Sequence, residues 1–148
     1  MKKILAIFAA TSLLIGSSMP ASAASTKSLK VGNLITVTYP SSVKLKKSGC
    51  QLIPFSYRVG NMGGLDFGFV YILDDEDTPI GGDILYRTPE FAKYQGEKTS
   101  KKSGKVNIKI CRSAWVDGDE EKVGATKGEF QVYVTTSKQD NVGYVKFN

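Results

Sequence analysis

Apolar and polar residues alternate along most of the chain, and this alternation predicts β-strands. Residues 104–115 show it most clearly, because Val106, Ile108 and Ile110 are separated by polar residues. In a strand, a period of two places one set of side chains against a core and the other set in water. We therefore expect residues 104–115 to form a strand with one buried face, and the other strands to pack against it.

Seven other segments show apolar runs or alternation and are bounded by turn-forming residues. The expected strands are residues 31–39, 43–47, 51–59, 65–73, 80–86, 104–115, 128–135 and 142–147. Residues 89–94 fit either one helical turn or a short strand. Short strands joined by turns predict an all-β fold, an antiparallel β-sandwich of seven or eight strands.

The sandwich is expected to be immunoglobulin-like in architecture. The spacing of Cys50 and Cys111 resembles that of the cysteines on the second and sixth strands of an immunoglobulin-like domain. Two hallmarks are missing, since Lys109 stands where such domains have a tyrosine and the third strand has no tryptophan. The resemblance therefore concerns architecture and indicates no family.

The first 23 residues have the pattern of a signal peptide. Lys2 and Lys3 precede an uncharged apolar run, residues 4–15, and the small residues that end at Ala23 form a cleavage signature. The apolar run is shorter than the ~20 residues that span a bilayer. We expect cleavage near Ala23 and a secreted or extracytoplasmic protein of a bacterial-type envelope or medium, with no membrane span in the mature chain.

The mature chain is expected to contain one domain. Residues 24–30 are small and polar, which is typical of a flexible lead-in. Residues 31–148 then form the single β-sandwich domain, whose length suffices for a core of its own.

The charge of the chain suggests anionic partners. The formal net charge is +6, and removal of Lys2 and Lys3 with the signal peptide lowers it to +4. A mildly basic protein is attracted to anionic wall polymers and lipid headgroups, although a small net charge also serves solubility. We expect the partner to be an anionic cell-envelope polymer, a glycan or another exported protein, and not nucleic acid, which an exported protein rarely meets.

Cys50 and Cys111 are the two cysteines, and in an exported protein such a pair predicts one disulfide. A loop of this length would stabilise the fold by ~4 kcal/mol on the chain-entropy argument. Both residues have the parity of the less apolar face of their strands. The bridge is therefore expected near a sheet edge or on an outer face, or, if a bulge shifts the register, between the sheets.

The chain contains no histidine, which excludes Ser-His-Asp and Cys-His catalysis and His-ligated zinc. If the cysteines are bonded, no thiolate is left as nucleophile or metal ligand. We therefore expect a non-catalytic binding or interaction module without a cofactor. A small glycan hydrolase that works through carboxylates and a purely structural envelope component are the alternatives.

Two acidic clusters supply candidate calcium ligands. Asp74, Asp75 and Asp77 lie in the first cluster, and residues 117–121 contain the second. Carboxylate oxygens suit Ca²⁺, but neither cluster has the spacing of a calcium loop, and acidic residues are common in exposed turns. We therefore expect no metal site, and name these aspartates as the candidates if the chain does hold calcium.

The candidate ligand contacts are Trp115, Lys98, Lys101 and Lys102. An exposed tryptophan can stack on a sugar ring or anchor a protein partner. A lysine-rich loop can meet an anionic polymer. The alternatives are that Trp115 covers a core edge or the disulfide, and that the lysines form an ordinary solvated surface.

Overall fold

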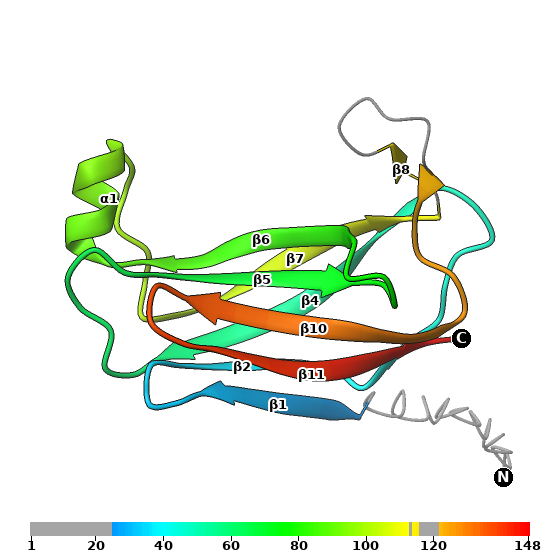
Figure 1. The fold of residues 1–148 in the computed structure, drawn as a ribbon, viewed down its shortest axis with the longest axis horizontal. Helices are drawn as coiled ribbons and strands as arrows, with labels where there is room; N and C mark the ends of the chain where they lie inside the picture. Colours follow the sequence, from blue (N-terminus) through cyan, green and yellow to red (C-terminus); the bar gives the residue numbers. More distant parts are fainter. Residues whose placement is uncertain (1–24, 113, 116–121) are drawn as a thin grey trace, which may run out of the picture.

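The computed structural model describes residues 25–112, 114–115 and 122–148, which form two β-sheets that face each other (Figure 1). The predicted signal peptide, residues 1–23, lies outside the described residues. In the first sheet, called here the four-stranded sheet, the order is β1 (Thr26–Val31), β2 (Ile35–Pro40), β4 (Cys50–Val59) and β7 (Ser103–Cys111). In the second, the five-stranded sheet, the order is β3 (Ser42–Val43), β11 (Asp140–Phe147), β10 (Gly128–Thr136), β5 (Phe67–Leu73) and β6 (Pro79–Arg87).

The remaining elements are short. A two-stranded sheet pairs β8 (Ala114–Trp115) with β9 (Lys122–Val123), and the helix α1 (Pro89–Gln95) connects β6 to β7. All pairings in the two main sheets are antiparallel except that of β3 with β11. The prediction of an all-β sandwich is confirmed. Among the described residues, eight strands have six or more residues and three have two.

The core lies between the sheets and contains one parity of each long strand except β6, where consecutive residues are buried next to a register shift. Its fully buried side chains include Val37 of β2, Phe55 of β4, Ile108 of β7, Val70 of β5 and Val132 of β10. These positions alternate with exposed or half-buried ones, as the sequence pattern predicts. The core-facing residues therefore determine which side chains the outer faces present.

The expectation of a flexible lead-in over residues 24–30 is wrong, because Thr26–Val31 forms β1 and pairs along its whole length with β2. The predicted strand 31–39 is in fact interrupted by a turn, in which Leu34 N–H donates to the carbonyl of Val31 at 3.0 Å. Gly32 adopts φ +52° there, a conformation that glycine tolerates. Only Leu29 and Val31 of β1 face the core, so the sequence of this edge strand resembles a loop.

Pro54 lies within β4 without the loss of a ladder hydrogen bond. The N–H groups of Val59 and Arg112 donate to Lys102 and Gly49, so the odd-numbered residues of β4 bond to β7. Pro54 therefore faces β2, whose pairing with β4 ends at Ser56. The first half of β4 therefore has no partner on that side, and the missing N–H of Pro54 costs the sheet nothing.

The helical alternative for residues 89–94 is the correct one. Thr88 caps α1 by accepting a hydrogen bond from Phe91 N–H, and Pro89 occupies the first turn, where its missing N–H needs no partner. Gly96 ends the helix in the left-handed conformation, with φ +70°. Phe91 packs on Phe67 with the ring centroids 5.2 Å apart, so the helix docks against the start of β5.

Two glycines let the sheets approach each other at the edges of the sandwich. A Cβ atom on Gly81 of β6 would lie 2.7 Å from the carbonyl oxygen of Lys109 of β7. A Cβ atom on Gly143 of β11 would overlap the hydroxyl of Tyr39 of β2. No other residue fits either position without a shift of its neighbours, so the edges are closed by close backbone contact.

The predicted disulfide between Cys50 and Cys111 is present and lies on the outer face of the four-stranded sheet. The two residues are directly opposite each other on β4 and β7, with a Cα–Cα distance of 3.9 Å. Their parity in the sequence indicated this position, and no bulge moves them to the core. The bond thus joins neighbouring strands of one sheet, unlike the inter-sheet bond of antibody domains.

Replacing both cysteines with Ala is expected to lower the free energy of unfolding by about 4 kcal/mol, because the bond closes a loop of 61 residues. Little packing is lost, since Cys50 is exposed. Urea denaturation measures the change, and reduction of the native protein serves as the control. A loss below about 1 kcal/mol would show that strand pairing already supplies the restraint.

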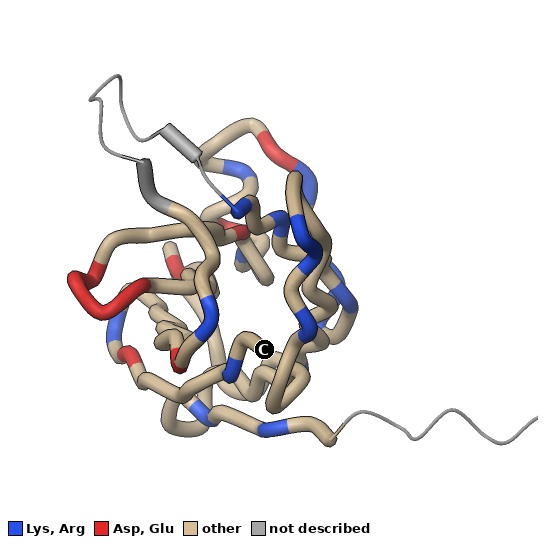
Figure 2. The backbone as a smooth tube through the Cα atoms, turned by 90° about the vertical axis from the view of Figure 1, so that its right-hand side faces the viewer, with Lys and Arg blue, Asp and Glu red and all other residues tan. Residues whose placement is uncertain are grey.

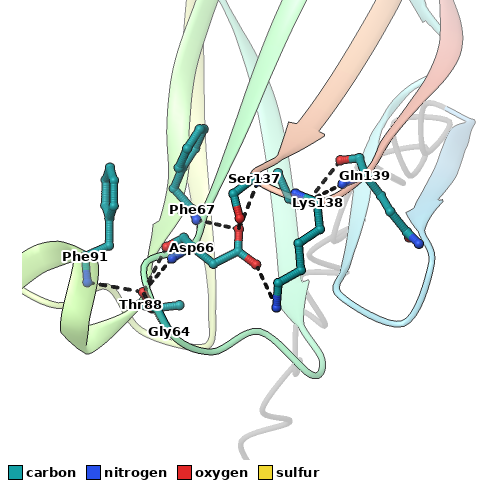
Figure 3. A network of polar contacts seen from close by, with 9 residues as sticks. Gly64, Asp66, Phe67, Thr88, Phe91, Ser137, Lys138 and Gln139 are labelled. Carbon is teal, nitrogen blue, oxygen red and sulfur yellow. Dashed lines mark hydrogen bonds and ion pairs between the residues drawn. The ribbon is translucent and has the colours of Figure 1, made fainter.

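The buried residue Asp66 joins two loops and the helix at the end of the sandwich that carries α1 (Figure 3). Asp66 Oδ1 accepts hydrogen bonds from Phe67 N–H at 2.8 Å and from the N–H and hydroxyl of Ser137 at 3.0 and 2.8 Å. Lys138 Nζ lies 3.9 Å from Oδ2. The backbone N–H of Asp66 donates to the hydroxyl of Thr88, the cap of α1. Asp66 thus ties the β4–β5 loop, the β10–β11 turn and the helix together.

Asp66→Ala is expected to lower the free energy of unfolding by about 3 kcal/mol, because partly buried donors of Phe67 and Ser137 lose their acceptor. Asp66→Asn is the matched control, since it keeps one oxygen acceptor and loses only the charge near Lys138. It should lose less than half as much. Equal losses in urea denaturation of the two variants would mean that the ion pair, and not the hydrogen bonds, holds this end.

Candidate functional site: a basic sheet face

The four-stranded sheet is strongly basic. Its strands carry the cationic residues Lys27, Lys30, Arg58, Lys105 and Lys109 and no Asp or Glu. The strands of the five-stranded sheet carry Arg87 and Lys146 against Asp83, Glu129 and Asp140. Figure 2 shows basic residues along the four-stranded sheet on the right, and the acidic β5–β6 turn on the left.

Strand alternation directs most of these cations outward. Ile108 and Ile110 of β7 are buried, so Lys105 and Lys109 project from the opposite face. On β4, burial of Tyr57 and Val59 places Arg58 outside in the same way. The hydrophobic pattern that forms the core therefore also produces the basic outer face.

The strand register aligns cationic and hydroxyl side chains in two rows that cross all four strands. The first row is Lys30, Thr36, Arg58 and Ser103, each directly opposite the next. The second row is Ser28, Thr38, Ser56 and Lys105. Neighbouring strands lie about 4.8 Å apart, so each row presents a donor at every strand. We call these eight residues the basic rows.

The basic rows surround an open depression of about 660 Å³. Its lining consists of Lys30, Thr36, Thr38, Ser56, Tyr57, Arg58, Ser103, Gly104 and Lys105. Three of these side chains are cations, and five have hydroxyl groups, which can donate hydrogen bonds. Such a lining suits an anionic, hydrated ligand better than an apolar one.

No acidic partner neutralises the cations of this face within the part of the chain that the structure describes. The ion pair found there joins Lys138 to Asp66, at the end of the sandwich. Exposed Lys30, Arg58 and Lys105 are therefore available for an anion, and Arg58 can bind phosphate or carboxylate through two parallel hydrogen bonds.

The chain matches no protein-family model and no curated protein. The function must therefore be inferred from the geometry. Within the described residues, no helix has the length and apolar character needed to cross a membrane.

The predicted contacts Lys98, Lys101 and Lys102 are all exposed, in the segment between α1 and β7. The carbonyl of Lys101 accepts a hydrogen bond from the Tyr57 hydroxyl at 3.0 Å, and that of Lys102 accepts one from Val59 N–H at 2.7 Å. These bonds hold the end of the lysine-rich segment beside β4. Lys101 and Lys102 immediately precede Ser103, which belongs to the basic rows.

Lys30, Arg58 and Lys105 cannot be recognised as a group from the sequence alone. Each has the parity opposite to a core residue in a predicted strand or next to one, so each could be assigned to an outer face. Their assembly depends on the order of the strands, which a single sequence does not reveal. The signal in the sequence was the strand parity of the basic residues, which indicates that each one lies on an outer face.

The remaining candidates from the sequence are Trp115 and the two acidic clusters. The side chain of Trp115 and residues 117–121 lie outside the described residues, although the backbone of Trp115 belongs to β8. Asp74 Oδ1 accepts hydrogen bonds from Glu76 and Thr78 N–H, and so stabilises the β5–β6 turn. Over the described ranges, no three Asp, Glu or Cys side chains converge on a position that could hold a metal ion.

Tyr57 links the core to the lysine-rich segment, and its ionisation opposes folding. Burial raises the pKa of Tyr57 above its ordinary value of 10.0, and Tyr86 acts in the same direction. The folded protein therefore keeps the neutral hydroxyl that donates to Lys101. The stability that depends on it is complete below pH 10.0 and declines as the pH rises through the folded-state pKa.

Tyr57→Phe is expected to lower the free energy of unfolding by about 1 kcal/mol at neutral pH, because the hydrogen bond to Lys101 is lost. The decline of stability at alkaline pH should also become smaller. Tyr94→Phe is the control, because Tyr94 is 77% exposed. Urea titrations at pH 7 and above pH 10 compare the two, and an unchanged alkaline decline in Tyr57→Phe would refute the assignment.

Proposed function

We propose that this protein is an exported, non-catalytic binding module that attaches to an anionic polymer of the cell envelope through the basic rows. The observation that supports the proposal is the alignment of Lys30, Arg58 and Lys105 with hydroxyl groups on four adjacent strands without any acidic residue. Phosphate, sulfate and carboxylate groups all accept hydrogen bonds from such donors.

A polymer fits this surface better than a small anion. The depression is open, so each cation remains partly hydrated and a single ion pair there contributes little. Several weak contacts with one chain add up, because the first contact raises the effective concentration of the remaining charged groups. Lys101 and Lys102 extend the surface beyond β7 and could contact the same chain.

Export and the absence of catalysis are parts of this proposal and rest on the sequence. They follow from the signal-peptide pattern that ends near Ala23 and from the lack of histidine. An immunoglobulin-like architecture is proposed only in the coarse sense of two packed antiparallel sheets. The strand order β1-β2-β4-β7 differs from the A-B-E-D sheet of immunoglobulin domains.

The triple variant Lys30→Gln, Arg58→Gln, Lys105→Gln is expected to bind dextran sulfate and long-chain polyphosphate at least about tenfold more weakly than the native protein. Binding of the native protein should weaken as salt rises, because the contacts are exposed and electrostatic. Biolayer interferometry on immobilised polymer, at several salt concentrations, measures both effects.

The matched control is Lys93→Gln, Lys127→Gln, Lys146→Gln, which removes the same charge from exposed positions off this face. It should retain most of the binding. Equal weakening in the two triple variants would show that only net charge matters and would refute a specific surface. A hydrolytic activity that a single Asp or Glu substitution abolishes would contradict the non-catalytic proposal.

A further inference from the structure

The outer face of the five-stranded sheet carries a continuous group of aromatic side chains. Tyr71 of β5 is directly opposite Tyr133 of β10, which is opposite Val142 of β11. Phe69 and Tyr144 lie two residues from this row, on the same face. The fully buried Val70, Ile72, Val132 and Val134 occupy the other parity, so these rings face away from the core. We call Phe69, Tyr71, Tyr133 and Tyr144 the aromatic face.

Three rings of the aromatic face, those of Phe69, Tyr71 and Tyr133, are held in place before any ligand arrives. Phe69 and Tyr71 are stacked with their centroids 4.2 Å apart, and Tyr71 lies 6.5 Å from Tyr133. Gly82 of β6 leaves room for them, since a Cβ atom there would lie 3.0 Å from each of the two stacked rings. The Tyr133 hydroxyl donates a hydrogen bond to Asp140 Oδ2. A fixed platform loses little conformational entropy when it binds.

The polar groups around the rings are mainly hydrogen-bond acceptors and amides. Asp140 of β11 and Gln131 of β10 are on the same outer face as Tyr133. Gln131 Nε2 donates to Asp77 Oδ1 at 3.1 Å, which brings the acidic β5–β6 turn to this face. The strands β5, β10 and β11 carry one cation, Lys146. This face therefore repels the anionic polymer that the basic rows attract.

From this combination we infer that the aromatic face binds an uncharged polysaccharide. Aromatic rings pack against the C–H faces of sugar rings, while carboxylate and amide groups take up the sugar hydroxyls. An open sheet face with rings on neighbouring strands suits an extended chain. A second copy of this protein fits less well, because these strands offer one cation, Lys146, to meet the acidic turn and Asp140 of a partner copy.

Native affinity electrophoresis tests the inference. The probes are four uncharged soluble polysaccharides: mixed-linkage β-glucan, galactomannan, hydroxyethyl cellulose and glycol chitin, each cast in the gel. At least one should retard the native protein, and Tyr71→Ala and Tyr144→Ala should each raise its dissociation constant about tenfold. High salt should leave the retardation unchanged, because no ion pair is involved.

Two matched variants make the result specific. Tyr94→Ala removes an exposed aromatic ring from α1, away from this face, and should not change the retardation. The Lys30→Gln, Arg58→Gln, Lys105→Gln variant should also be retarded normally, so failure of one binding surface is distinguishable from failure of the other. The inference is overturned if no probe retards the protein, if Tyr71→Ala and Tyr144→Ala behave as native, or if these variants instead abolish a concentration-dependent dimer.

Discussion

The covalent pairing of Cys50 with Cys111 fixes the register of β4 against β7, and the basic rows depend on that register. A slip by one residue would turn every side chain of a strand to the opposite face. A slip of β4 would point Arg58 at the core and Tyr57 at water. A slip of β7 would do the same to Lys105 and Ile108. A bond between directly opposite residues excludes such a slip, so it acts on the arrangement of the surface as well as on stability.

The two ends of the sandwich are held by different chemistry. The disulfide lies at the end where β7 leads into β8, and the Asp66 network lies at the end that carries α1 (Figure 1). The disulfide is covalent and exposed, whereas Asp66 is fully buried and works through hydrogen bonds. The carboxylate holds the β4–β5 loop to the β10–β11 turn, and the backbone N–H of Asp66 bonds to the cap of α1. Loss of the acceptor would leave partly buried donors unpaired, which is unfavourable. The loops at that end are therefore more ordered than their small and polar sequences suggest.

The sequence predicted strands well where alternation was strong. Residues 51–59 and 128–135 correspond closely to β4 and β10, because Ile53, Phe55 and Val132 are buried as the pattern indicates. Residues 26–30 were missed, since an edge strand with a polar outer face resembles a loop. The two rows could not be predicted as units, because their members come from strands up to 77 residues apart, from Ser28 to Lys105. Parity along each strand is local information, whereas strand order is not.

The uneven distribution of charge between the sheets gives the molecule a dipole that runs from one sheet to the other. The four-stranded sheet is positive on all its charged positions, and the acidic turn at Asp74–Asp77 belongs to the opposite side. The electric field of an anionic layer acts on this dipole and turns the positive sheet toward the layer. The effect reaches about one Debye length, or about 10 Å at moderate salt. The molecule would adsorb in one orientation, with the aromatic face directed away from the layer.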